Sequence, residues 1–220
     1  MILDNNFISI VFLGYFNPAI LNNDFLKENK ILITDEKPIR ENPTTPVFKS
    51  IEYLNLKFII DLERFQIIEE RINNFKDTKL INIAFKYFDV LKYTPLFVCG
   101  INFNLNVKIL DIENFINLIK GNYILELLNI NSFVINIKRE ILKKEEKFIG
   151  LNIRAKLNTD KLIQLNLDKK DDSDVFILNY NYELRELDKK TENKLYIKNN
   201  YVEIFKDFDI FVKKFFKDKK

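Results

Sequence analysis

The feature that most constrains the fold of this 220-residue chain is a segment in which apolar and amide side chains alternate. In the second half of Leu96–Ile109 every other residue is apolar, and Asn102, Asn104 and Asn106 stand between the apolar positions. Successive side chains of a β-strand point to opposite faces of a sheet, so this period predicts a strand with one apolar face and one amide face. Such a strand belongs in a sheet whose apolar face is covered.

The same alternation, or a continuous apolar run, marks further strands along the chain. These strands are predicted at 7–16, 54–62, 64–69, 133–141, 148–157, 162–167 and 175–187. Helices are predicted at 25–30, 78–92, 112–120 and 201–216, where capping residues or apolar residues at helical spacing occur. The chain has 21 Phe and only four Gly, and a core rich in aromatic and β-branched side chains favours strands.

The order of these elements predicts an α+β fold, in which helices cover one face of antiparallel strands. A strand, a short helix, several strands and a long helix occur twice along the chain. This order predicts an internal duplication, with a first α+β half at 1–93 and a second at 94–220 within one compact structural domain. Three of the five prolines fall in 35–46, which is predicted to be the longest loop.

The composition excludes many kinds of catalytic site. The chain has no His and one Cys, which excludes a Ser-His-Asp or Cys-His system, an imidazole ligand and a zinc cluster. Its four scattered Gly form no glycine-rich phosphate loop. We therefore predict no catalytic, cofactor-binding or metal-binding residues and no cofactor. Cys99 stands in an apolar strand, where a buried and unreactive thiol is expected.

Carboxylates leave one enzymatic alternative open. Asp61 and Glu63 are two residues apart on a predicted strand, so they share a face and fit a divalent cation. A solubilising role at the strand edge is the simpler interpretation of this pair. The run Asp171–Asp174 lacks the spacing of a calcium-binding loop and is interpreted as a solvated turn.

Four short segments stand out as motifs. They are Ile10–Ile20, with Phe-Asn-Pro after a strand; Arg64–Gln66; Tyr93–Asn102, where Thr-Pro leads into Gly-Ile-Asn; and, more weakly, Asn179–Tyr182. Together they resemble an uncharacterised family of prokaryotic proteins of similar length. That family tends to carry a His in the last segment, and this sequence has none there. No activity is attached to the family, so the resemblance implies no catalytic residue.

The candidate interaction surface combines a motif with the amide face. Asn17 and Pro18 follow the first strand, while Asn102, Asn104 and Asn106 form the polar face of a later strand. A polar strand face either hydrogen-bonds a ligand or is the wet side of a sheet. Asn17 and Asn102 also have a structural interpretation, in which they hydrogen-bond the local backbone, and Pro18 one in which it ends a strand.

These observations favour a non-catalytic protein that binds another protein, either within a multi-protein assembly or as a homo-oligomer. The reason is that a fold with many strands has edges that need a partner or a cover. A role as an accessory of a prokaryotic defence or mobile-element system is a further hypothesis. The alternatives are an RNA-binding subunit and an enzyme that uses carboxylates and a metal.

Charge and targeting signals limit the partners and the location. The net charge is +3 with mixed signs, which supplies no strong field for nucleic acid, although the C-terminal lysines form a local excess. No secretion signal is recognised, and the apolar run at 7–16 is too short to span a membrane. With a single thiol, these features predict a cytoplasmic protein without a membrane partner.

Overall fold

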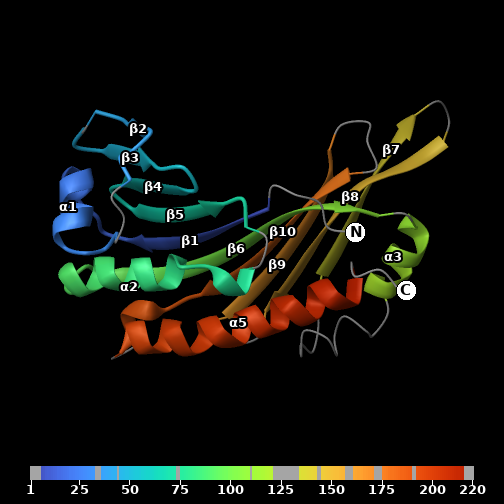
Figure 1. Ribbon diagram of the computed structural model, residues 1–220. Helices are drawn as coiled ribbons and strands as arrows, with labels where there is room; N and C mark the ends of the chain where they lie inside the picture. Colours follow the sequence, from blue (N-terminus) through green and yellow to red (C-terminus); the bar gives the residue numbers. More distant parts are fainter. Residues whose placement is uncertain are drawn as a thin grey trace.

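The computed structural model describes residues 6–32, 36–43, 45–72, 75–109, 111–120, 134–142, 145–156, 161–170, 175–189 and 192–215. Within these residues the chain forms one antiparallel sheet of ten strands with helices on one side (Figure 1). The predicted α+β class, an antiparallel sheet with covering helices, is therefore confirmed.

Among its described residues, the first half of the chain contributes five strands and two α-helices. They are β1 (Phe7–Gly14), α1 (Asn23–Glu28), β2 (Arg40–Glu41), β3 (Phe48–Glu52), β4 (Leu56–Asp61), β5 (Arg64–Glu70) and α2 (Leu80–Val90). The second half repeats this order of strands and helices. Its elements are β6 (Leu96–Lys108), α3 (Ile112–Lys120), β7 (Val134–Leu142), β8 (Glu145–Lys156), β9 (Lys161–Lys169), β10 (Val175–Leu184) and α5 (Asn193–Phe215).

The strand order of the sheet is symmetric about its centre. It reads β2-β3-β4-β5-β1-β6-β10-β9-β8-β7, so the first strand of each half meets the other in the middle. β1 and β6 pair antiparallel, with Ile10 opposite Ile101 near the middle of the register. The two halves thus share one continuous sheet and have the same strand order from its centre outward. That the repeat arose by duplication stays a prediction.

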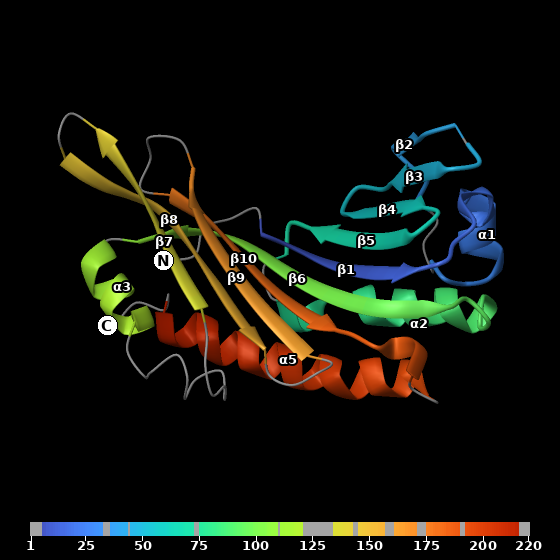
Figure 2. The ribbon, with the colours of Figure 1, turned by 180° about the vertical axis from the view of Figure 1, so that it is seen from behind.

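The hydrophobic core lies between the sheet and its two longest helices. α2 and α5 are seen side by side across the same face of the sheet in both ribbon views (Figures 1 and 2). Phe103 of β6 stacks on Phe208 of α5 with 3.9 Å between ring centroids, and Phe65 of β5 stacks on Tyr87 of α2 at 4.2 Å. Each fully buried aromatic side chain of this kind stabilises the fold by about 1.5–3 kcal/mol.

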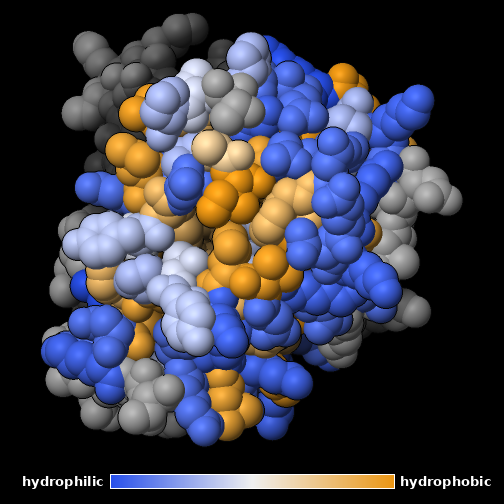
Figure 3. All heavy atoms as spheres, turned by 90° about the vertical axis from the view of Figure 1, so that its left-hand side faces the viewer, coloured by the Kyte–Doolittle hydropathy of each residue, from blue (hydrophilic) through white to orange (hydrophobic). Residues whose placement is uncertain are grey.

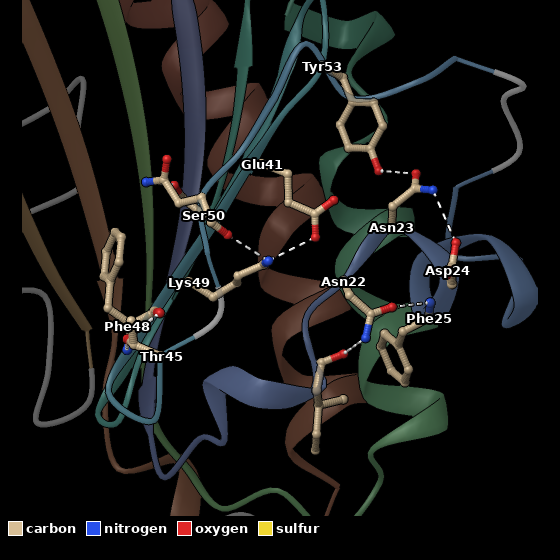
Figure 4. A network of polar contacts seen from close by, with 12 residues as sticks. Asn22, Asn23, Asp24, Phe25, Glu41, Thr45, Phe48, Lys49, Ser50 and Tyr53 are labelled. Atoms are coloured by element: carbon tan, nitrogen blue, oxygen red, sulfur yellow. Dashed lines mark hydrogen bonds and ion pairs between the residues drawn. The ribbon is translucent and has the colours of Figure 1, made fainter.

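A polar cluster fastens the β2–β3 edge to the rest of the fold (Figure 4). Lys49 is 3% exposed, and its ammonium lies 2.8 Å from a carboxylate oxygen of Glu41 and 2.7 Å from the carbonyl oxygen of Asn42. Nearby, the Tyr53 hydroxyl donates to the side-chain oxygen of Asn23 at 3.1 Å. A buried charge is tolerated only when it is paired in this way.

At the end where β1 terminates, three segments meet by backbone hydrogen bonds. The Phe16 amide donates to the Leu62 carbonyl oxygen at 2.9 Å, and the Tyr15 amide donates to that of Pro95 at 3.3 Å. Figure 3 shows this end of the molecule, where apolar side chains reach the surface among hydrophilic ones. Leu62 is 48% exposed there, and Tyr15 is 66% exposed.

Several predicted boundaries differ from the structure. α1 is capped by Asn22, whose side-chain oxygen accepts from the Phe25 amide at 2.8 Å, and not by the residues that follow it. β3 was not predicted at all. α5 begins at Asn193, eight residues before the predicted start, and β10 ends at Leu184 instead of 187. Among the described residues, no helix is both long and apolar enough to cross a membrane.

Candidate ligand-binding face

The side of the sheet opposite α2 and α5 is here called the open face, because no described helix packs on it (Figures 1 and 2). In β6 the residues Ile101, Phe103 and Leu105 are fully buried toward the helices. The alternation of the strand therefore puts Asn102 and Asn104, and likewise Asn106, on the open face. The predicted amide face of this strand therefore lies on the open face of the sheet.

Register extends these amides into a row that crosses five strands. Asn104 of β6 lies opposite Asn179 of β10, which lies opposite Asn166 of β9, which lies opposite Asn152 of β8. In the same register Asn136 of β7 lies opposite Asn152. We call the four residues on β6, β10, β9 and β8 the amide row. The Asn179 amide nitrogen donates to the Asn104 side-chain oxygen at 2.8 Å, and Asn152 donates in the same way to Asn166.

A hollow of about 430 Å³ lies beside the amide row, where the two halves of the sheet meet. We call it the junction hollow. Its lining comes from β5, β1, β6, β10 and the residue that follows β10, and it comprises Val11, Leu13, Arg64, Val98, Gly100, Asn102, Asn181, Glu183 and Arg185. Sites at the junction of two structural units, with apolar walls and a few polar groups, are typical of ligand pockets.

Gly100 leaves the floor of the junction hollow open. A Cβ atom at this position would lie 3.5 Å from the Asn181 side-chain oxygen, 3.9 Å from the Asn102 amide nitrogen and 4.0 Å from Val11 Cβ. The Asn181 oxygen is buried and has no hydrogen-bond partner. An unpartnered buried acceptor is costly, so this oxygen marks a place where a donor is missing.

Arg185 and Arg64, the two arginines of the junction hollow, differ in the charge of the side chain that each one binds. Arg185 binds Glu183 through two nitrogens, at 2.6 and 2.9 Å from the same carboxylate oxygen. The guanidinium of Arg64 instead donates to the neutral side-chain oxygen of Gln66 at 2.6 Å. Arg64 therefore brings a cation to the hollow whose positive charge is not offset by that contact.

Asn17 and Pro18 do not join the open-face residues. They lie beyond the end of β1, where Asn17 caps a 3-10 helix at Pro18–Ile20 by accepting from the Ala19 amide at 3.1 Å. Pro18 is buried in the first turn of that helix. This geometry agrees with the structural interpretation of Asn17, whereas Pro18 begins a 3-10 helix four residues after β1 ends and so does not end the strand. Asn102, Asn104 and Asn106 share one side of the sheet, where Asn104 is only 9% exposed.

The residues considered for metal binding or thiol chemistry, Asp61, Glu63 and Cys99, occupy positions that the fold itself explains. Asp61 ends β4, and its carboxylate accepts from the Glu63 and Arg64 amides at 2.9 and 2.7 Å, so Glu63 lies in a hairpin turn and not on a strand. Within the described residues no three His, Cys, Asp or Glu side chains are placed to hold a metal. Cys99 is fully buried, and burial raises the pKa of its thiol. Asp171–Asp174 lies outside the described residues.

Residues on β10 were missing from the candidate surface. Asn179 and Asn181 appeared only within a motif, and neither was proposed as a contact because sequence does not show which strand pairs with β6. The structure places Arg64, Gly100, Asn102 and Asn181, which come from three different motifs, around one hollow. The motif Asn179–Tyr182 was the available signal for Asn181.

Comparison with known proteins gives no family. No family model matches the sequence, and no curated protein matches it. Among solved structures, the chain is similar to a rolling circle replication initiator protein from Geobacillus stearothermophilus, with a TM-score of 0.29 and 10% identity over 83% of this chain and 73% of that one. So low a TM-score supports no inference about the fold or the function of this chain.

Proposed function

We propose that the protein is a non-catalytic binding protein of a multi-protein assembly, and that a polypeptide partner docks on the open face over the amide row. The observation that carries this proposal is the alignment of four asparagines from four strands. Each side-chain amide has two donor hydrogens and two acceptor lone pairs, and the cross-strand bonds use only part of that capacity. The remaining capacity matches the amide groups of a polypeptide.

Charge favours a polypeptide over a polyanion at the amide row itself. The four residues of the row are neutral, and the ionic groups of the junction hollow include the paired Glu183 and Arg185. Nucleic-acid binding draws most of its affinity from cations at phosphates, which a neutral row does not provide.

The test places a charged, longer side chain in the middle of the row. Asn179→Lys changes a residue that points away from the core, and Val202→Lys, at a 68% exposed position on α5, is the matched control. We expect the wild-type chain and Val202→Lys to capture the same protein from the native host and Asn179→Lys to lose it. Hydrogen exchange of the isolated complex should show protection in β6, β9 and β10.

Two results would contradict this proposal. One is a partner retained by Asn179→Lys, and the other is protection confined to the helix side. A second copy of the chain is distinguished from a foreign partner by light scattering, because the monomer has a mass of 26.4 kDa.

Nucleic-acid binding is the second candidate function. One observation favours it, which is that Arg64 reaches the junction hollow with only a neutral partner. A salt-dependent interaction with labelled single strands would support it, and its absence at low salt would exclude it.

A further inference from the structure

We propose that the junction hollow binds a nucleotide, with the base edge over Gly100 and the phosphate at Arg64. This site is separate from the amide row and goes beyond the partner-binding role proposed above. The nucleotide is either free or one unit of a strand, since both present the same base and phosphate.

Two polar groups lie above Gly100 and could pair with the edge of a base. The vacant Cβ position lies between the Asn181 side-chain oxygen at 3.5 Å and the Asn102 amide nitrogen at 3.9 Å. These are one acceptor and one donor, side by side on neighbouring strands, in positions that lie opposite each other in the register. The edges of nucleobases carry a donor beside an acceptor, and asparagine amides recognise them by pairing with both.

The Asn181 side chain has unused hydrogen-bonding capacity. The buried Asn181 oxygen accepts no hydrogen bond, while its amide nitrogen makes only a long contact of 3.3 Å with Glu183. A ligand that donates to this oxygen removes a desolvation cost already present in the empty protein. A purely apolar ligand would not do so, which favours a base over a hydrocarbon.

The size and the apolar lining of the junction hollow suit a planar ring. Its volume of about 430 Å³ lies within the range of about 300–1,000 Å³ found for small-molecule pockets. Val11, Leu13 and Val98 supply apolar contacts to the face of a planar ring. A hollow that is polar at its floor and apolar at its walls suits a heterocycle that enters edge first.

The Arg64 guanidinium lies at a distance from Gly100 that suits the phosphate of a nucleotide. Arg64 lies on β5, opposite Leu13 of β1, which in turn lies opposite Val98 of β6. Arg64 and Val98 are thus two strands apart, or about 10 Å. A nucleotide with its base over β6 directs its phosphate across β1 toward Arg64. Arg185 is already bound to Glu183, so we assign the phosphate to Arg64.

The test compares ligands on the wild-type protein by titration calorimetry. The probes are the four nucleoside monophosphates, the matching nucleosides, inorganic phosphate and single-stranded oligonucleotides of the same bases. We expect at least one monophosphate to bind, the matching nucleoside to bind about tenfold or more weakly, and inorganic phosphate alone to be weakest. Tighter binding of the oligonucleotide than of the monophosphate would identify a strand as the source, and the reverse a free nucleotide; either result supports the site.

Three variants localise the binding. Gly100→Ala fills the vacant Cβ position, so it should abolish binding of the monophosphate and of the nucleoside alike. Arg64→Gln should weaken the monophosphate about tenfold or more and leave the nucleoside unchanged. Arg40→Gln removes an arginine from β2 at the far edge of the sheet and should change neither affinity.

Two outcomes would overturn the proposal. In the first, no nucleotide or oligonucleotide binds the wild-type protein even at millimolar concentration and low salt. In the second, Gly100→Ala binds as tightly as wild type although circular dichroism shows it folded. Capture of a polypeptide partner is measured in a separate experiment with a different variant, so failure here leaves the partner-binding proposal standing, and the converse also holds.

Discussion

Two glycines of the central strand pair make a matched test of how the sheet is built, because alanine should act on them in opposite directions. Gly100 and Gly14 lie on β6 and β1, the two strands that join the halves of the fold. Neither has a positive φ, so the left-handed conformation plays no part in the comparison. The difference lies only in what a new Cβ atom would meet.

At Gly100 the new methyl group meets ordinary van der Waals distances, the shortest being 3.5 Å to the Asn181 oxygen. Gly to Ala at a compatible position stabilises a protein by about 0.4–1 kcal/mol, chiefly by restricting the unfolded chain. At Gly14 the Cβ would lie 2.1 Å from the carbonyl oxygen of Pro95, which is backbone and accepts from the Tyr15 amide at 3.3 Å. Forcing these segments apart should cost about 1–3 kcal/mol or more.

The assay is thermal and urea unfolding of both variants beside the wild type. Each kcal/mol should move the melting temperature by about 2–4 °C, upward for Gly100→Ala and downward for Gly14→Ala. The dependence of the unfolding free energy on urea should stay unchanged if only stability is altered. A destabilised Gly100→Ala, or a Gly14→Ala as stable as wild type, would refute the contact geometry on which the junction hollow also depends.

Three further predictions concern the buried Tyr180 and Cys99 and the half-buried Asp207. The Tyr180 hydroxyl is buried without a partner, so Tyr180→Phe should raise the free energy of unfolding by about 1 kcal/mol in urea titrations, and a loss of stability would show a missed partner. Burial, reinforced by Glu203, raises the pKa of Asp207 above its ordinary 3.8, although Lys206 and Lys161 oppose the shift. Because the folded pKa is raised, the protonated form favours the fold, and this contribution is lost as pH rises through the folded value. Asp207→Asn should therefore be more stable than wild type at neutral pH, with the difference vanishing as pH falls toward 3.8 in calorimetric scans. Cys99 is fully buried, which raises its thiol pKa, so it should react with a thiol reagent only as fast as the protein unfolds; rapid labelling of the native chain would contradict this.

The strands and helices with a regular apolar period could be predicted from the sequence. β6 is the best case, because the apolar residues of its second half, from Ile101 to Val107, all face one layer of helices and the pattern needs no knowledge of its neighbours. The start of α3 was also predicted, and the Asp111 carboxylate caps it by accepting from the Asn114 amide at 2.9 Å. Local chemistry determines both features.

Elements that depend on a distant partner could not be predicted. β3 places Lys49 at a position that faces the core, and the charge is tolerated there only because Glu41 and Asn42 are folded against it. The first turns of α5 mix polar and apolar residues without a regular period, and Lys194 holds them to α2 by bonding Asp89 and the Phe88 carbonyl oxygen, both at 2.8 Å. In each case a tertiary contact overrides the local pattern.

The amide row shows most directly why composition and register carry different information. The chain has 28 Asn, and an abundance of this kind would by itself scatter amides over all exposed strand positions. On the first half of the open face, however, the residues opposite one another in β1 and β5 include Val11 with Gln66 and Ser9 with Ile68. The asparagines align across β6, β10, β9, β8 and β7, where a shift of one residue in a strand would turn its side chains to the other face of the sheet. Their alignment is therefore a property of strand pairing, and it restricts the proposed partner surface to the second half of the sheet.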